Sequence, residues 1–224
     1  MGEDESDFVR KFLFAGIKAA LNSRVNFFPL PEVFYTRSAK IVARQLLGHW
    51  LIRQIAEGCC GGAIVETEAY LQDDPACHAS RGETARNRPM FGPPGRAYVY
   101  FIYGNHWCFN AVTNRVGVGE AVLVRAIEPL FGKEFMRTNR AVAKPHELTN
   151  GPAKFCEAMD IDRRLNHANL CETKSPIFIA ENPSRKKFLK EQGPIVTTTR
   201  IGIRLAAHLP LRFYLENSEF VSRR

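Results

Sequence analysis

The chain has 224 residues, of which 45% are hydrophobic and 24% are charged, and its formal net charge is +8. This length and this balance exclude a disordered tail and allow a sizeable apolar core. The positive charge favours an anionic partner, such as nucleic acid or a membrane surface, although the same excess would also serve solubility alone.

The apolar segments and the cysteines narrow the classes further. The best candidate for a membrane span, residues 12–17, is interrupted by Lys18, whereas a transmembrane helix needs about 20 mostly apolar residues. The six cysteines lack the CxxC spacing and the paired histidines that structural zinc requires. We therefore expect no membrane segment, no metal site and reduced thiols in an intracellular protein.

Periodicity and turn residues divide the chain into an N-terminal extension and one domain. Residues 1–24 have an acidic start and then a short amphipathic helix at 8–21, and the domain covers residues 25–224. Residues 71–95 are a long polar loop, and such loops are usually functional or disordered. The expected helices are 38–47, 131–143 and 151–158, and the expected strands are 49–55, 62–70, 121–128, 177–180, 200–205 and 211–215. This pattern predicts a single mixed α+β domain with an antiparallel sheet.

Residues 98–107, YVYFIYGNHW, predict a β-hairpin between the long loop and the strand at 121–128. Aromatic and β-branched residues favour strands, and the Gly104–Asn105 pair favours the turn between them. Tyr103 then stands at the hairpin tip. An aromatic side chain there is either packed at a strand end or protrudes as a wedge, and the pattern alone leaves both open.

Two carboxylates are predicted to share one face of the strand at 62–70. The strand period of two places Glu66, Glu68 and Tyr70 on the same side. They form either a solvated face or one wall of a cleft, because the strand leads into the long loop. A carboxylate that an arginine aligns can act as a general base toward water, and Arg125 in an apolar strand requires such a partner. A purely structural ion pair is the alternative.

The loop at 71–95 and the residues after it carry His78 and several arginines. Spaced arginines beside aromatic residues suit contact with phosphates together with stacking on bases, although any single arginine is equally at home on a plain surface. The arginines are Arg81, Arg86, Arg88 and Arg96.

These segments together resemble the alkyladenine (3-methyladenine, or methylpurine) DNA glycosylase family. The resemblance covers about residues 30–220 and rests on the segments ARQLLGHWL, AIVETEAY, RNRPMFGPPGRAYVYFIYG, CFNAV, AVLVRAIEPL, TNGPAKFC and PLRFYL. It implies a compact mixed fold with a curved antiparallel sheet, surrounding helices and a protruding hairpin.

The resemblance also implies roles for individual residues. Glu68 would be the general base that activates a water for attack on the sugar C1′, and Arg125 with the backbone of Leu123 and Val124 would hold that water and the carboxylate. Tyr103 would be wedged into the duplex in place of the flipped nucleotide. The base pocket would consist of Tyr70, His78, Tyr100, Asn110 and Leu123, with Asn110 crowding the exocyclic amine of guanine. Contacts to the DNA backbone would come from Arg86, Arg88, Arg96 and Lys154.

The expected activity is that of a monofunctional glycosylase that flips damaged purines, alkylated or deaminated, out of duplex DNA. It would act as a monomer without a cofactor or a metal, in the nucleoid or the nucleus. Three alternatives remain: a bifunctional glycosylase/lyase in which Lys154 forms a Schiff base, a non-catalytic reader of damaged DNA, and a basic RNA-binding fold. The hairpin departs from the family pattern at Asn105, which is more polar than the apolar residue often found there, and His78 lies one residue closer to Tyr70 than in some relatives.

Overall fold

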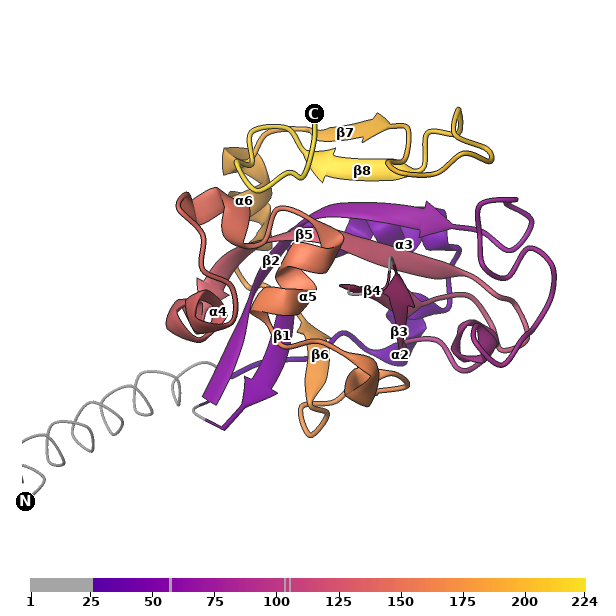
Figure 1. Ribbon diagram of the computed structural model, residues 1–224, viewed down its shortest axis with the longest axis horizontal. Coiled ribbons are helices and arrows are strands. Elements are labelled where there is room, and N and C mark those ends of the chain that lie inside the picture. The colour runs from indigo at the N-terminus through magenta and orange to yellow at the C-terminus, as the bar shows by residue number, and fades with distance from the viewer. Residues whose placement is uncertain (1–25, 57, 103, 105) are drawn as a thin grey trace, which may run out of the picture.

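A computed structural model describes residues 26–224 of the chain, except residues 57, 103 and 105 (Figure 1). The predicted N-terminal helix and the hairpin-tip residue Tyr103 lie outside the described residues. The helices are α2 (Glu32–Tyr35), α3 (Ala39–Leu46), α4 (Lys133–Asn139), α5 (Pro152–Ala158) and α6 (Arg185–Glu191), with 3₁₀ turns at Arg88–Phe91, Pro145–Leu148 and Arg163–Leu165. The strands are β1 (Trp50–Ile55), β2 (Gly58–Tyr70), β3 (Ala97–Ile102), β4 (His106–Val112), β5 (Ala121–Phe131), β6 (Ile177–Ala180), β7 (Ile195–Thr198) and β8 (Arg212–Leu215).

The long strand β2 organises the antiparallel sheet. The strand order is β3-β4-β5-β2-β1-β6, and β8 pairs with both β2 and β7. Strand β1 pairs with β2 as far as Ala63, and β8 pairs with the same strand from Glu66 to Glu68. The carboxyl-terminal half of β2 is therefore enclosed by β5 on one side and β8 on the other.

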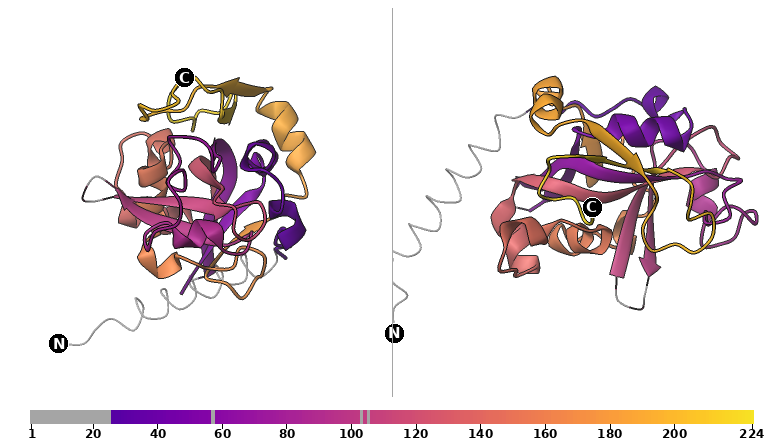
Figure 2. Two further views of the ribbon diagram at one scale, coloured as in Figure 1. Left: turned by 90° about the vertical axis from the view of Figure 1, so that its right-hand side faces the viewer. Right: turned by 90° about the horizontal axis from the view of Figure 1, so that it is seen from above.

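The sheet is strongly curved. In Figure 1, β2 and β5 run across the view, whereas β3 and β4 are seen nearly end-on, and the right-hand view of Figure 2 shows β3 and β4 side by side. The register of β2 against β5 shifts three times, once beside Gly62 and twice around Glu66. Such bulges bend a strand and re-aim its side chains. A Cβ atom at Gly62 would collide with the carbonyl of Glu128, so this close approach of β2 and β5 requires glycine.

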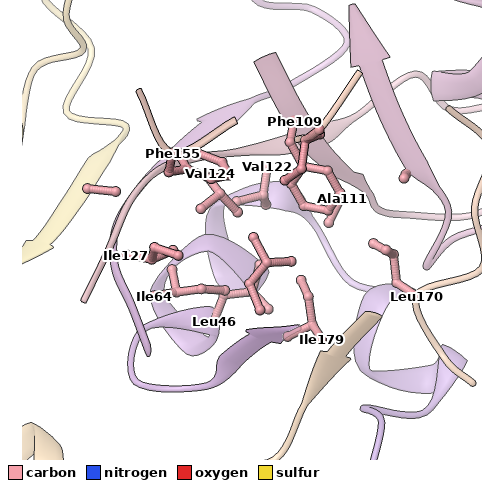
Figure 3. Packing of buried hydrophobic residues seen from close by; sticks show 14 of the residues in the cluster. Leu46, Ile64, Phe109, Ala111, Val122, Val124, Ile127, Phe155, Leu170 and Ile179 are labelled. Atoms are coloured by element: carbon pink, nitrogen blue, oxygen red, sulfur yellow. The ribbon is translucent and has the colours of Figure 1, made fainter. Parts of the chain in front are cut away.

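The helices anchor the two strands that carry the predicted site. Helix α3 lies against β2 and β5, and α5 lies against β4 and β5 (Figure 1). The amide of Ala39, at the start of α3, donates to the buried carboxylate of Glu120, just before β5, at 2.8 Å. The apolar side chains between these elements form one core, part of which Figure 3 shows around Leu46, Ile64, Val124 and Phe155. Packing on this scale holds β2 and β5 rigidly in place.

The structure confirms the single mixed domain and corrects several boundaries. The expected strand at 200–205 is wrong, because these residues form bends and turns and the strand lies earlier, at β7. The helix expected at 131–143 is shorter, because β5 continues past Pro129 to Phe131 and α4 begins after Gly132. Strand β2 begins at Gly58, so residues 58–61, expected in the connection, belong to the sheet. Helix α6 was not anticipated. Across residues 26–224, the three gaps aside, no helix has both the length and the apolar character needed to cross a bilayer.

Candidate active site

One cavity is lined by residues from the strands and the loop that carry the site residues predicted from the sequence. Its volume is about 400 Å³, within the range of small-molecule sites. Strands β2, β3, β4 and β5, the loop at 71–95, the start of α5 and residues 201–203 all contribute to its walls. The described lining residues are Tyr70, Ala76, His78, Met90, Tyr98, Tyr100, Ile102, Cys108, Asn110, Ala121, Leu123, Arg125, Pro152, Ala153, Ile201, Gly202 and Ile203.

The carboxylate of Glu68 lies directly behind the lining residues Tyr70, Arg125 and Ile201. It is fully buried and accepts hydrogen bonds from the Tyr70 hydroxyl and the Ile201 amide, each at 2.8 Å. Its Oε1 atom also lies 3.1 Å from Nη1 of Arg125. All three partners line the cavity. Two hydrogen bonds and one ion pair thus fix the orientation of the Glu68 carboxylate.

A second buried carboxylate, Glu66, supports Arg125 from the other side. Its Oε1 atom lies 3.1 Å from Nε of Arg125 and 2.6 Å from Nε of Arg212 in β8. The amide and hydroxyl of Ser222 also donate to Glu66, at 2.7 and 2.9 Å. Arg125 is thus held between Glu66 and Glu68, as the shared face of β2 predicts. Burial lowers the pKa of Arg125, but the charges of Glu68 and Glu66 outweigh it and raise that pKa overall.

Aromatic rings form one wall of the cavity. The ring centroids of Tyr98 and Tyr100 are 5.3 Å apart, and the His78 ring meets the Tyr100 ring edge-on at 4.6 Å. Burial raises the pKa values of Tyr70 and Tyr100 far above the usual value, and the charge of Glu68 adds to the shift at Tyr70. Tyr70 therefore keeps the proton that it donates to Glu68.

The polar groups of this wall are also neutral at physiological pH. Desolvation and the charge of Arg86 lower the pKa of His78, whose Nδ1 atom lies 2.9 Å from the Tyr98 hydroxyl. Burial raises the pKa of the Cys108 thiol to about 11. The side-chain amide of Asn110 donates to the carbonyl of Tyr98 at 3.1 Å, which fixes its orientation in the pocket. The cavity thus presents flat, uncharged surfaces and one arginine, and the fixed carboxylate of Glu68 lies behind them.

The residues expected at the DNA backbone are not among the described residues that line the cavity. The guanidinium of Arg86 lies 5.7 Å from the Tyr100 ring centroid, and its Nη2 atom donates to the carbonyl of Phe101. Arg88 is exposed and paired with Glu83, Arg96 is half-buried beside Ala97, and Lys154 donates to Asn150 at 2.8 Å. Their predicted contacts to phosphate stay predictions, as does the wedge role of Tyr103, which lies outside the described residues.

Sequence reasoning found six lining residues and missed several others. Tyr98 could have been found, because it lies two residues before Tyr100 on the same face of a strand. Ile201 could not, because the group that it offers to Glu68 is a backbone amide, which no residue type announces. The lining residues anticipated from the sequence are Tyr70, His78, Tyr100, Asn110, Leu123 and Arg125. Their catalytic and binding roles stay predictions.

Comparison with known proteins identifies the family. The methylpurine-DNA glycosylase (MPG) profile matches residues 33–219. A relative from Carboxydothermus hydrogenoformans is 48% identical over 195 residues, covering 87% of this chain and 99% of its own. A relative from Methanoculleus marisnigri is 49% identical with the same coverage, and one from Methanocella arvoryzae is 48% identical over 200 residues, covering 87% and 96%. All three carry the provisional name of 3-methyladenine DNA glycosylase. The chain therefore belongs to the methylpurine-DNA glycosylase family, and it is a DNA glycosylase.

Proposed function

We propose that this protein removes alkylated and deaminated purines from duplex DNA as a monofunctional glycosylase and leaves an abasic site. The observation that carries the proposal is the Glu68 carboxylate, which accepts hydrogen bonds from Tyr70 and Ile201 and pairs with Arg125. All three partners line an aromatic cavity of about 400 Å³. A purine inside a duplex cannot reach an enclosed site, so the nucleotide must first be flipped out of the stack.

The proposed reaction is hydrolysis of the bond between C1′ and the purine nitrogen. Glu68 accepts a proton from water as the oxygen attacks C1′, and the electrons of the breaking bond leave with the base. A purine alkylated at N3 or N7 carries a positive charge, so it departs as a neutral molecule without further help. For such a cationic base the protein supplies mainly position and an activated water. A neutral purine such as hypoxanthine instead needs help with its departure, because it leaves as an anion that must take a proton from solvent water.

Binding of the flipped base would use the aromatic wall and the hairpin. The rings of Tyr70, Tyr100 and His78 offer stacking surfaces, and Asn110 fills space that the exocyclic amine of guanine would need. Tyr103 would occupy the gap that the base leaves, which offsets an extrusion cost of a few kcal/mol. Arg86, Arg88, Arg96 and Lys154 would contact phosphates of the duplex. In this arrangement the protein acts as a monomer on the DNA of the cell.

A base-release assay tests the proposal directly. Duplexes that carry 3-methyladenine, 7-methylguanine, hypoxanthine or ethenoadenine are incubated with excess protein, and the free base is separated chromatographically from the DNA. We expect release of at least one cationic methylpurine and no release from an undamaged duplex. Tight binding to these duplexes without release would instead identify a non-catalytic reader of damaged DNA.

Treatment with borohydride separates the monofunctional enzyme from a lyase that uses Lys154. An imine between lysine and the sugar is reduced to a covalent protein–DNA adduct, whereas hydrolysis by water forms none. Because Lys154 lies beside Pro152 and Ala153 at the cavity and is held by Asn150, it is the lysine to test. We expect no adduct, and we expect Lys154→Ala to keep the single-turnover rate of base release within about threefold of wild type. An adduct that Lys154→Ala abolishes would show the lyase mechanism.

A further inference from the structure

A buried ion pair behind the cavity connects three segments that line it: the end of β2, the loop at 71–95 and residues 201–203. Asp74 in the loop at 71–95 pairs with Nη1 of Arg200, and the two side chains are 1% and 0% exposed. Neither residue is among the described residues that line the cavity. Their charges therefore do not contact a base in the cavity, and any role in the site must act through the residues that they contact.

Arg200 contacts the two residues that end β2. Its Nη1 atom donates to the carbonyl of Ala69 at 3.1 Å, and its guanidinium carbon lies 4.7 Å from the ring centroid of Tyr70. A planar guanidinium stacks on an aromatic face in a way that an ammonium does not. Because Arg200 is buried and Tyr70 lines the cavity, the guanidinium supports the ring from the protein side.

The residue after Arg200 is in direct contact with Glu68. The Ile201 amide donates to Oε1 of this carboxylate at 2.8 Å, and Ile201 lines the cavity. Residues 200–205 form bends and turns rather than a strand, so no ladder of sheet hydrogen bonds fixes this amide. The side chain of Arg200 is the adjacent anchor that does so.

Asp74 carries the constraint into the loop. Its Oδ1 atom accepts a hydrogen bond from the Ala76 amide at 3.0 Å, and its backbone carbonyl accepts one from Cys77 at 2.8 Å. Ala76 and His78 line the cavity on either side of Cys77. The Asp74–Arg200 ion pair thus contacts or adjoins the cavity-lining part of the loop at 71–95, the Tyr70 ring and the Ile201 amide.

We propose that Asp74 and Arg200 are positioning residues that set the place of Tyr70 and of the Ile201 amide, and through them the orientation of the Glu68 carboxylate. The inference rests on the proposed function in that Glu68 is taken as the general base. Neither Asp74 nor Arg200 touches the reacting atoms.

The test uses the full-length chain and two readouts. The first is hydrogen exchange of the Ile201 amide by NMR, which reports the contact with Glu68 whether or not the protein is active. The second is the single-turnover rate of base release at saturating protein, with the dissociation constant for the same duplex. The variants are Arg200→Lys, Arg200→Met and the double variant Asp74→Asn/Arg200→Met. The double variant leaves no unpaired charge in the interior, so it is the one to use if a single variant does not fold.

We expect the double variant to release base at least tenfold more slowly than wild type, to exchange the Ile201 amide at least tenfold faster, and to bind the duplex within about threefold. Arg200→Lys keeps the charge but not the planar stack, so its rate should lie between wild type and Arg200→Met. Arg185→Met is the matched control, because Arg185 donates to the carbonyls of Leu47 and Gln45, which do not line the cavity. Its rate and its Ile201 exchange should be those of wild type.

The outcomes are distinguishable from failure of the proposed function. If the wild-type protein released no base, the proposed function would fail, and exchange at Ile201 would still decide whether the ion pair holds this amide. Wild-type exchange in the double variant overturns the inference, and so does a wild-type rate of base release in an active protein.

Discussion

Replacing Glu68 by glutamine is expected to slow base release from an alkylated duplex by a factor on the order of 10² to 10⁴, the usual contribution of a general base. The amide cannot accept the proton of the attacking water. It can nevertheless occupy the same space, because its oxygen can replace Oε1, which receives Ile201 and Arg125, and its nitrogen can replace Oε2. The Tyr70 hydroxyl, which donates to Oε2, needs only to rotate to become an acceptor.

The measurement is a single-turnover rate with protein in excess, together with a gel-shift titration of the same duplex. Binding should change by less than about threefold, since the aromatic wall and the basic residues are unaltered. Glu134→Gln provides the control, because Glu134 is exposed on α4 and lies apart from the described lining of the cavity. Retained turnover in Glu68→Gln would remove Glu68 from the role of general base and leave it a structural partner of Arg125.

The part of the site that can be predicted from the sequence is the part that depends on positions within one strand and on the cost of burying a charge. The period of two places Glu66 and Glu68 on one face, and the cost of an unpaired guanidinium predicts a carboxylate beside Arg125. Both expectations depend on local geometry and on charge, which the residue types carry with them. In the structure, guanidinium nitrogens of Arg125 lie 3.1 Å from a carboxylate oxygen of Glu66 and 3.1 Å from one of Glu68.

The part that sequence reasoning cannot reach depends on contacts between distant segments. Arg212 and Ser222 are 146 and 156 residues away from Glu66, and Arg200 is 126 residues away from Asp74. A charged residue shows that a partner is required, but not which of the other charges in the chain meets it. Arg212, for example, meets Glu66 because β8 pairs with β2, and the sequence does not predict this pairing.

The error at residues 200–205 has a local cause. Ile201, Ile203 and Leu205 alternate with other residues as in a strand, which is the pattern that predicted one. Gly202 has a φ of 76° and Ala206 has a φ of 48°, and neither value occurs in an extended strand. The segment turns at these residues, and the turn presents Ile201, Gly202 and Ile203 to the cavity. The periodicity was misleading because Ile201 and Ile203 line a pocket and Leu205 is exposed, so the three side chains do not form one face of a sheet.

Replacing Glu66 by alanine should destabilise the fold more than any surface substitution. Glu66 is fully buried and pairs with both Arg125 and Arg212. Its loss leaves Arg125 with Glu68 as its remaining acidic partner, and it leaves Arg212 without an acidic partner among the described residues. Removing one partner of a buried pair costs about 3–5 kcal/mol, a large part of the free energy of unfolding of a typical domain. For a domain of this size each kcal/mol lowers Tm by about 2–4 °C.

Urea unfolding followed by circular dichroism gives the free energy of unfolding of wild type and variant. Glu191→Ala is the matched control, because Glu191 is 60% exposed and lies 3.8 Å from the exposed Lys187, and an exposed pair contributes only about 0–1 kcal/mol. Deleting residues 222–224 should give an intermediate loss, since it removes both donors of Ser222 and the Arg223 carbonyl that accepts from Arg212, but leaves the two arginines paired with Glu66. If Glu66→Ala cost no more than Glu191→Ala, water would have to solvate the two guanidinium groups. Glu66 would then not be the residue that fixes Arg125 beside Glu68.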